Sequence, residues 1–202
     1  MIVLGITGSI GMGKSVAAAQ LRRLGIPVHD ADAVVHALMA PGGVAVESVG
    51  KAFPGVVKNG AIDRAALGAK VFGDDKALAK LEGILHPLVR QRHARFIAAA
   101  QRRRLPLVAL DIPLLFETGG EGQCDAVAVV SAPGFLQEQR VLKRRGMTPE
   151  RLAAVMSRQM PDAEKRRWAD YIVPTGNGRR ATLRQWVRIV RALRAYRSTV
   201  DA

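Results

Sequence analysis

The sequence predicts an α/β protein in which a five-stranded parallel sheet lies between two layers of helices. Five short apolar runs of strand length alternate with helical patterns, at residues 2–6, 26–29, 107–110, 126–130 and 171–173. Hydrophobic residues make up 49% of the chain and aromatic residues only 4%, which favours a core of Ala, Val, Leu and Ile around buried parallel strands. Two segments between these runs, 33–105 and 140–168, have helical patterns and are predicted to be helical insertions.

The first apolar run leads into a glycine-rich motif. Residues 8–15 fit the pattern G-x-x-x-x-G-K-S, and a helical pattern follows at residues 16–24. The glycines let backbone N–H groups turn inward around a phosphate, and the start of the helix adds its positive dipole end. Lys14 is placed to reach the β- and γ-phosphates, and the Ser15 hydroxyl to ligate Mg²⁺. The motif predicts a P-loop NTPase fold that binds a nucleoside triphosphate.

This motif has two other interpretations. A glycine-rich turn without a ligand is the first, but the preceding strand and the following helix favour the phosphate loop. The second is a dinucleotide-binding loop, but its G-x-G-x-x-G spacing is not matched.

Composition limits the size and the surroundings of the protein. At 202 residues the chain has room for one α/β core with insertions rather than for two full domains. A single cysteine, Cys124, excludes an intramolecular disulfide framework and an all-cysteine metal site. We expect a cytoplasmic protein, since there is no secretory pattern and no run of about 20 apolar residues. The net charge of +14 fits either nucleic acid or small polyanionic substrates.

Carboxylates and then helices follow the second predicted strand. Asp30 and Asp32 come directly after it, where parallel sheets bind ligands; alternatively, one of them only caps the next helix. We expect no strand between residues 33 and 104. Three helices are predicted there: one capped by Asp63 and ending at residue 72, one capped by Asp75 and ending at residue 85, and one that begins at Pro87.

The second half of the chain continues the alternation of strands and helices. The strand at 107–110 ends in Asp111, which either holds a magnesium-bound water or caps the turn before Pro113. The later elements are predicted as a strand at 126–130, a helix at 133–145, a helix starting at Thr148 and Pro149, a short helix starting at Pro161, a strand at 171–173, and a last helix with a capping box of Thr182 and Gln185.

Basic residues are concentrated in two places. Those from 140 to 167 are predicted to form solvated helix faces, except that Arg140 and Arg144 lie at the mouth of a lid that closes over phosphates. The arginines of the last helix are predicted to be solvated rather than to bind RNA or lipid: Arg180, Arg184, Arg188 and Arg191. We expect Trp168 and Trp186 to serve in packing.

The remaining candidates suit the transfer of a phosphoryl group to a hydroxyl. Such an enzyme needs a triphosphate loop, Mg²⁺, a carboxylate for the acceptor and positive charge. Asp32 is the candidate carboxylate. His86 is either a histidine at a helix start or a substrate contact. The run Leu114, Leu115 and Phe116 belongs to the core or binds an apolar part of the acceptor.

Several motifs together resemble those of the dephospho-CoA kinase family, in the same order over nearly the whole chain. They are the P-loop at 7–15, Leu24-Gly25 to Asp30-Ala-Asp32, Leu85-His86-Pro87, Asp111-Ile-Pro-Leu-Leu-Phe-Glu117, Gln159 and Ala169-Asp-Tyr-Ile172. The resemblance implies a kinase that transfers the γ-phosphoryl group of ATP to the ribose 3′-hydroxyl of 3′-dephospho-CoA, the last step of coenzyme A biosynthesis. It also implies three parts: a nucleotide-binding core (1–32, 106–139 and 169–202), a helical substrate-binding insertion (33–105) and a helical lid (140–168).

The resemblance also implies roles for particular residues. Catalytic roles are expected for Lys14, Asp32 and Arg140; ATP binding for Gly11, Met12, Gly13, Lys14, Ser15 and Val16; substrate binding for Asp32, His86, Leu114 and Glu117; and metal binding for Ser15. Ser9 and Met12 depart from the family's common loop, and Thr175 stands where an asparagine is common, which leaves adenine contacts there open.

The expected cofactor is Mg²⁺, and the expected partners are ATP and 3′-dephospho-CoA. We expect no nucleic acid, no membrane partner, and a monomer or a weak homo-oligomer. The alternative function is that of another P-loop kinase for a small molecule or a nucleoside monophosphate. A GTP-dependent switch is disfavoured because the guanine-reading pattern N-K-x-D is absent. A nucleic-acid-binding ATPase is suggested only by the charge of +14.

Overall fold

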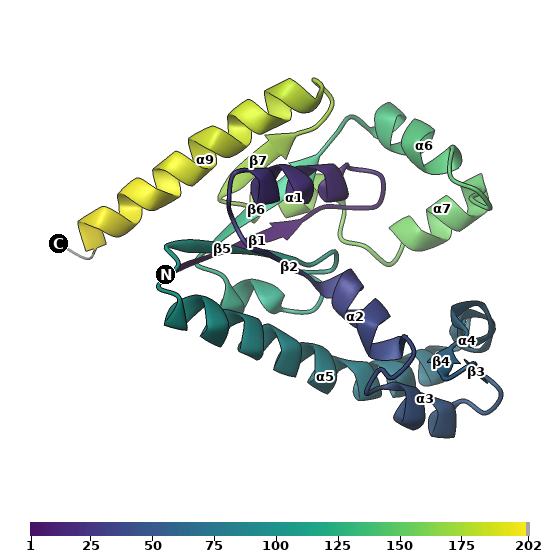
Figure 1. Cartoon of the computed structure of the whole chain (residues 1–202). Helices are drawn as coiled ribbons and strands as arrows, with labels where there is room; N and C mark the ends of the chain where they lie inside the picture. The colour runs from purple at the N-terminus through teal and green to yellow at the C-terminus, as the bar shows by residue number, and fades with distance from the viewer. Residues whose placement is uncertain (201–202) are drawn as a thin grey trace. The chain divides into compact units, whose positions relative to one another are not determined.

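The computed structural model describes residues 1–200, with side chains to residue 196, and its centre is a parallel sheet (Figure 1). In this part of the chain the sheet has five strands in the order β2-β5-β1-β6-β7. The strands are β1 Ile2–Thr7, β2 Val28–Asp30, β5 Leu107–Asp111, β6 Ala126–Ser131 and β7 Tyr171–Pro174. β1 pairs in parallel with β5 and β6, and β6 with β7. The predicted α/β fold with a five-stranded parallel sheet is confirmed.

Helices lie on both faces of this sheet. The helices of the described residues are α1 Lys14–Arg23, α2 Ala31–Met39, α3 Val46–Ala52, α4 Arg64–Val71, α5 Asp75–Arg102, α6 Gly134–Leu142, α7 Pro149–Met156, α8 Asp162–Arg167 and α9 Arg179–Val200, with a short 3₁₀ helix, Gly120–Gln123. The 3₁₀ helix was not predicted from the sequence.

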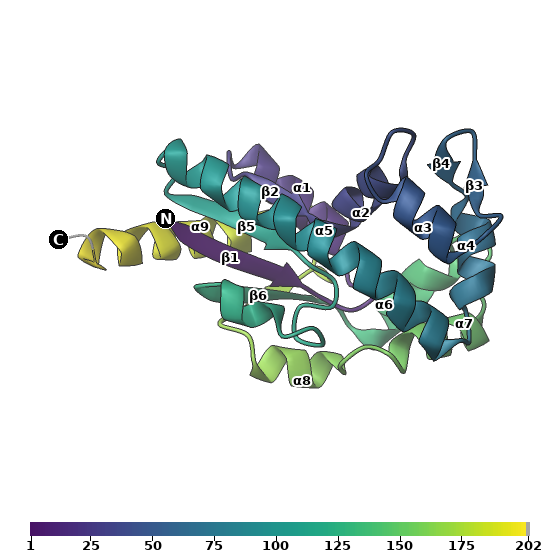
Figure 2. The ribbon, with the colours of Figure 1, turned by 90° about the horizontal axis from the view of Figure 1, so that it is seen from below.

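The residues of β6 show how the sheet is covered. Ala126, Ala128 and Val130 belong to one apolar cluster, and Val127 and Val129 belong to another, as the alternation of side chains in a strand requires. Side chains of α1 and α9 complete the first cluster, and both helices lie on that face (Figure 1). The second cluster is completed by the loop after β5 and by residues that flank α8, which lies on the other side (Figure 2). The sheet is therefore the middle of three layers.

Two predicted helix starts are confirmed by their hydrogen bonds. The Asp63 carboxylate accepts from the N–H groups of Ala65 and Ala66 and caps α4. The Thr148 hydroxyl accepts from Arg151 N–H and caps α7, whose first residue is Pro149. Both caps satisfy N–H groups that a helix start leaves without an intrahelical partner.

The prediction of no strand between residues 33 and 104 is wrong. Residues Val57–Lys58 (β3) and Ala61–Ile62 (β4) form a short antiparallel hairpin. Asn59 and Gly60 join them with φ angles of 50° and 74°, the left-handed conformation that two-residue hairpin turns require. The Asn-Gly pair is a strong hairpin signal, but the strands beside it are too short to give a period-2 pattern.

The prediction of a helix break before Pro87 is also wrong. α5 is continuous from residue 75 to residue 102 and contains Pro87 in its interior. Leu81 and Leu85, one turn apart ahead of the proline, are buried in the same apolar cluster. A proline inside a helix costs about 3 kcal/mol, whereas each buried leucine side chain contributes about 1.5–3 kcal/mol. Packing on one face of α5 therefore outweighs the local cost.

The predicted capping box of Thr182 and Gln185 is wrong as well. α9 begins at residue 179, ahead of both side chains. The Thr182 hydroxyl donates to Pro174 O (3.0 Å), and Gln185 Nε2 donates to Ile172 O (3.4 Å). These side chains tie α9 to β7 and do not cap its own first turn.

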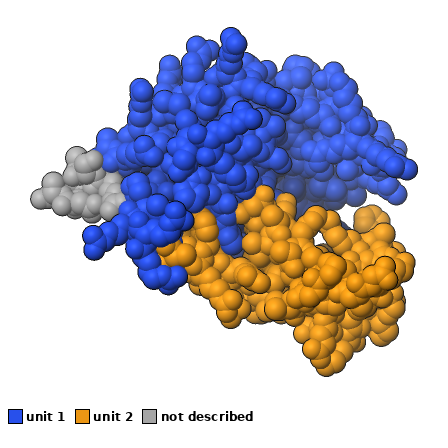
Figure 3. Space-filling view, in the orientation of Figure 1, with its two compact units in different colours: residues 1–29, 100–202 blue, residues 30–99 orange. Residues whose placement is uncertain are grey.

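The chain divides into two compact units (Figure 3). One comprises residues 1–29 and 100–202, and contains the clusters on the sheet. The other comprises residues 30–99, with its own apolar cluster around Leu38, Val49 and Val56. Among the residues described, none of the helices combines the length and the apolar character needed to cross a bilayer.

Candidate active site

The phosphate loop follows β1 directly and ends at the first turn of α1. Its glycines at positions 11 and 13 have φ angles of 77° and 91°, which side chains rarely adopt. A Cβ on Gly11 would lie 2.5 Å from Val141 Cγ2 and 2.9 Å from Gln137 O. A Cβ on Gly13 would lie 3.1 Å from Thr175 Oγ1. Only glycine fits at Gly11, because both the φ angle and the neighbouring backbone exclude a side chain.

Three consecutive carbonyl groups of this loop accept hydrogen bonds from side chains outside it. Ile10 O accepts from Gln137 Nε2 at 2.8 Å, and Gly11 O from Arg140 Nη1 at 3.3 Å. Met12 O accepts from the Thr175 hydroxyl at 2.6 Å. In a trans peptide the C=O and the N–H of the same peptide unit point in opposite directions. Because side chains outside the loop hold the three carbonyls, the N–H groups of residues 11–13 are directed to the opposite side. One of them, Met12 N–H, donates to Ser9 O (3.2 Å).

Lys14 forms an ion pair at the end of the neighbouring strand. Its Nζ lies 2.6 Å from Asp111 Oδ1, and the carboxylate is almost completely buried. Asp111 is the last residue of β5, and its register partner in β1 is Ile6. The strand pairing therefore places this carboxylate beside the phosphate loop. Neither of the two roles predicted for Asp111 from the sequence included an ion pair with Lys14.

The N-terminus of α1 is open to an anion. Gly13 occupies the N-cap position, and the described structure has neither a side-chain cap nor an acidic residue in the first turn. Ser15 and Val16 are exposed in this turn. Free N–H groups and the helix dipole make such a terminus a binding position for phosphate.

Arg140 and Thr175 together support the loop. Arg140 Nη1 donates to Thr175 Oγ1 (3.1 Å), and Nη2 donates to Thr175 O (2.9 Å). Thr175 N–H in turn donates to Ser131 O, at the end of β6. From the sequence, Arg140 was predicted as a site residue, whereas Thr175 was only a departure from the family's pattern. Its hydroxyl joins Met12 to Arg140, a role that no sequence pattern reveals.

Glu117 is engaged by a buried lysine. Its Oε1 lies 2.8 Å from Lys165 Nζ and accepts from Met160 N–H at 2.8 Å. Lys165 is fully buried and also donates to Pro113 O (3.3 Å). The prediction that Lys165 belongs to a solvated helix face is therefore wrong: α8 packs against the sheet, and the ion pair compensates for burial of the charge.

The apolar run before Glu117 divides between core and surface. Leu115 and Phe116 are buried in the second sheet cluster, whereas Leu114 is 37% exposed. Trp168 contacts the Phe116 ring edge to face, with centroids 5.9 Å apart, but stays largely exposed. Trp186 is fully buried, so the packing predicted for it is confirmed.

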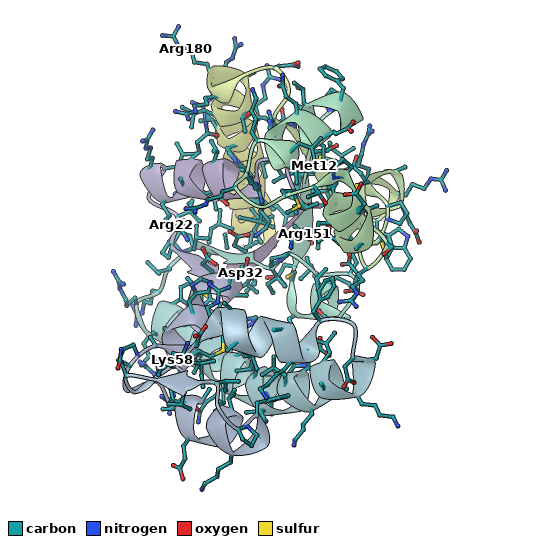
Figure 4. All side chains as sticks on the ribbon, turned by 90° about the vertical axis from the view of Figure 1, so that its right-hand side faces the viewer. Met12, Arg22, Asp32, Lys58, Arg151 and Arg180 are labelled. Carbon is teal, nitrogen blue, oxygen red and sulfur yellow. The ribbon has the colours of Figure 1, made fainter. Side chains whose placement is uncertain are left out.

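Asp30, Asp32 and His86 belong to the unit of residues 30–99. The Asp30 carboxylate accepts from Ala33 N–H (3.0 Å) and caps α2, so Asp30 is the capping residue of the two. Asp32 is exposed in the first turn of α2 (Figure 4). His86 is exposed in the middle of α5, so its interpretation as a residue at a helix start is wrong.

The basic face of α9 is exposed as predicted. Arg180 extends away from the helix (Figure 4). The arginines of this face are all exposed: Arg180, Arg184, Arg188 and Arg191.

Within the part of the chain that is described, no group of three or more His, Cys, Asp or Glu side chains could hold a metal ion.

Known proteins resemble this chain over most of its length. A family profile described as dephospho-CoA kinase matches residues 2–181. A dephospho-CoA kinase of Paramagnetospirillum magneticum is 67% identical over 166 residues, covering 82% of this chain and 78% of the relative. A dephospho-CoA kinase of Mesorhizobium japonicum is 52% identical over 199 residues, covering 98% of this chain and 100% of the relative.

Solved structures agree with the sequence relatives. TT1252 from Thermus thermophilus is 38% identical with a TM-score of 0.81, covering 95% of this chain and 96% of that chain. A shikimate kinase from Acinetobacter baumannii, 15% identical with a TM-score of 0.51 and covering 95% of this chain and 94% of its own, shares the fold. The resemblance in the sequence motifs is thus confirmed, and the chain belongs to the dephospho-CoA kinase family.

Proposed function

We propose that the protein transfers the γ-phosphoryl group of ATP to the ribose 3′-hydroxyl of 3′-dephospho-CoA and releases CoA and ADP. The observation that carries the proposal is the conformation of the phosphate loop. Three successive carbonyls of the loop accept hydrogen bonds from side chains outside it, and the adjoining start of α1 has no capping side chain. Membership of the family supplies the acceptor. The reaction is the last step of coenzyme A biosynthesis.

The loop and Lys14 bind the triphosphate of ATP in this proposal. The ATP-binding residues are Gly11, Met12, Gly13, Lys14, Ser15 and Val16. Backbone N–H groups of the loop and of the first turn of α1 donate to phosphate oxygens, and Lys14 Nζ compensates their negative charge. Because the loop is already held by side chains, little reorganisation is needed when charge moves onto the β-phosphate.

The residues beside Lys14 suit a magnesium ion. Ser15 and Asp111 offer a hydroxyl and a carboxylate, the hard oxygen ligands that Mg²⁺ prefers, and a cationic group already lies 2.6 Å from the Asp111 carboxylate. Mg²⁺ usually takes one or two protein ligands and its others from phosphates and water. When bound, it would neutralise charge on the phosphate oxygens. We therefore propose Ser15 as a metal ligand, with Asp111 as a second one.

Asp32 acts on the acceptor in the proposed mechanism. Its carboxylate orients the 3′-hydroxyl and accepts its proton as the oxygen attacks the γ-phosphorus. Two observations support this role: Asp30 does the capping of α2, and Asp32 is exposed two residues beyond the end of β2. A capping carboxylate would be occupied by backbone N–H groups, whereas Asp32 is available to a ligand.

Arg140 compensates charge on the transferring group. A guanidinium has five N–H donors, and three hydrogen bonds of Arg140 go to Gly11 O, Thr175 Oγ1 and Thr175 O. The remaining donors can bind phosphate oxygens, while the bonds to Thr175 fix the position of the side chain. Charge-assisted hydrogen bonds of this kind are stronger than neutral ones.

Substrate binding completes the proposal. We assign His86, Leu114 and Glu117 to the acceptor, together with Asp32. Leu114 offers exposed apolar surface, and Glu117 keeps Oε2 without a partner among the described residues. The proposed parts are the nucleotide core at 1–32, 106–139 and 169–202, the substrate insertion at 33–105 and the lid at 140–168.

The test is the identification of the product by mass spectrometry and phosphorus NMR. The protein is incubated with MgATP and, in separate reactions, with 3′-dephospho-CoA, AMP or CMP. The proposal predicts ADP and a 3′-phosphorylated product only with 3′-dephospho-CoA. Phosphorylation of AMP or CMP without any reaction of 3′-dephospho-CoA would assign the protein to nucleoside-monophosphate kinases instead.

A further inference from the structure

Ile10, in the middle of the phosphate loop, has both of its backbone polar groups bonded to glutamine side chains. Its N–H donates to Gln159 Oε1 at 3.0 Å, and its carbonyl accepts from Gln137 Nε2 at 2.8 Å. Gln137 belongs to α6, and Gln159 follows the end of α7. A residue whose N–H and C=O are both held has little freedom in φ and ψ, so the two amides set the backbone conformation at Ile10.

The orientation of each amide follows from the backbone group that it meets. A peptide N–H can only donate, so Gln159 must present its oxygen to Ile10. A peptide carbonyl can only accept, so Gln137 must present its nitrogen. The two glutamines therefore perform opposite tasks, one as an acceptor and the other as a donor.

Both glutamines are themselves held in place. Gln137 is buried and Gln159 is half-buried. The residue after Gln159 is anchored as well, because Met160 N–H donates to Glu117 Oε1. Gln137 and Gln159 line a cavity of about 140 Å³ together with Met156 and Met160. It leaves room for a slightly longer side chain at either position.

The loop downstream of Ile10 depends on this conformation. The carbonyls of Gly11 and Met12 are bonded to Arg140 and Thr175, so Ile10 is the first of three residues whose carbonyls are turned outward. A change in ψ at Ile10 would rotate the next peptide unit and redirect the Gly11 N–H. The N–H groups that face a phosphate would then lose their common direction.

We propose that Gln137 and Gln159 are positioning residues for ATP, which hold Ile10 so that the loop N–H groups converge on the phosphates. Neither glutamine needs to touch the nucleotide. The inference rests on the nucleotide site of the proposed function, but not on the identity of the acceptor.

The experiment exploits the opposite tasks of the two side chains. A glutamate can only accept in its ionised form, and a lysine can only donate. We therefore compare Gln137→Lys and Gln137→Glu with Gln159→Glu and Gln159→Lys, and measure the Kd for MgATP by calorimetry. Gln137→Lys and Gln159→Glu should stay within about threefold of the unmodified protein, whereas Gln137→Glu and Gln159→Lys should weaken binding about tenfold or more.

This crossover separates hydrogen bonding from charge. If charge near the phosphates were decisive, both glutamate variants would bind weakly and both lysine variants tightly, and the proposal would be overturned. Equal affinity of all four variants would overturn it as well. Gln139→Glu and Gln139→Lys, at an exposed position of the same helix, measure the effect of charge alone.

Thermal denaturation of each variant serves as the control that the variant is folded. Should a charged variant fail to fold, Gln137→Met or Gln159→Met replaces it, since methionine has a similar length and does not form the hydrogen bond; about tenfold weaker binding is again expected. A wild-type protein that binds MgATP but does not phosphorylate 3′-dephospho-CoA would contradict the proposed function. The Kd values of the glutamate and lysine variants would still decide the role of the two glutamines.

Discussion

Lys14 Nζ and Asp111 Oδ1 lie 2.6 Å apart at the carboxyl ends of β1 and β5. The pair joins the phosphate loop to the neighbouring strand of the sheet, and the register of Ile6 with Asp111 holds the carboxylate in place. In the proposed function, the same carboxylate serves both the lysine and a cation bound with ATP. Replacing Lys14 should lower both activity and stability, whereas replacing Asp111 as well should restore stability but not activity.

We predict that Lys14→Met lowers kcat/KM for MgATP by about 100-fold or more, because a cation that compensates phosphate charge is lost. The variant should also unfold at lower temperature, since the buried Asp111 carboxylate loses a charged partner. Steady-state kinetics and thermal unfolding measure the two effects.

The double variant Lys14→Met with Asp111→Asn provides the control for stability. It should unfold at a higher temperature than Lys14→Met alone, because the carboxylate that lost its lysine partner has been replaced by a neutral amide. Its activity should stay low. Equal stability of the single and double variants would show that the Asp111 carboxylate costs no stability once its lysine partner is lost.

The two carboxylates at the carboxyl end of β2, Asp30 and Asp32, should behave in opposite ways. Asp32→Asn is expected to lower kcat by about 100-fold or more, because the acceptor hydroxyl loses its base, with little change in the unfolding temperature. Asp30→Ala should cost about 1 kcal/mol of stability, because α2 loses its cap. Full turnover by a folded Asp32→Asn protein would refute the proposed base.

Thr175 is predicted to support ATP binding through its hydroxyl. Thr175→Val removes the bond to Met12 O and the acceptor for Arg140 while keeping the size of the side chain. The KM for ATP should rise about tenfold. Thr175→Ser keeps the hydroxyl and should remain close to the original protein. If valine and serine give the same KM, the hydroxyl has no such role.

Cys124 should be unreactive in the folded protein. Burial, with smaller contributions from Asp125 and Glu121, raises the pKa of its thiol to about 12. The thiolate is the nucleophile, so reaction with an aromatic disulfide reagent at pH 8 should be much slower than in guanidinium chloride. Equal rates in the two conditions would contradict the raised pKa.

The same pKa predicts a dependence of stability on pH. The folded protein holds the Cys124 proton more tightly than the unfolded chain does, whose thiol has the ordinary value of about 8.5. This contribution is fully present below the unfolded pKa and is lost as pH rises through the folded value. Cys124→Ala should therefore lose less stability between pH 9 and about 12 than the original protein, as measured by denaturant unfolding.

Elements with a strong local pattern could be predicted from sequence. The apolar strands, the Gly-Lys-Ser end of the loop and the caps at Asp63 and Thr148 each depend on neighbouring residues. Pro87 shows where local reasoning fails. The proline destabilises the helix locally, but the burial of α5 side chains against residues far away in the sequence outweighs this cost.

The candidate site divides in the same way. A motif can identify Lys14 and Ser15 because the chemistry of phosphate binding fixes their spacing. It cannot identify Thr175 as a support of Met12, since the two are 163 positions apart in the chain. Lys165 was misplaced for a related reason: it lies in a charged run, and only the packing of α8 pairs it with Glu117.

The amino-acid sequence by itself determined the five strands of the parallel sheet, the phosphate loop and the family to which the chain belongs. Hydrophobic periodicity and motif spacing are local properties, so they can be recognised without coordinates. Only the tertiary structure decided which side chains hold the loop carbonyls and which carboxylate meets Lys14. Those contacts join residues far apart in the chain, and their partners are set by strand register and helix packing.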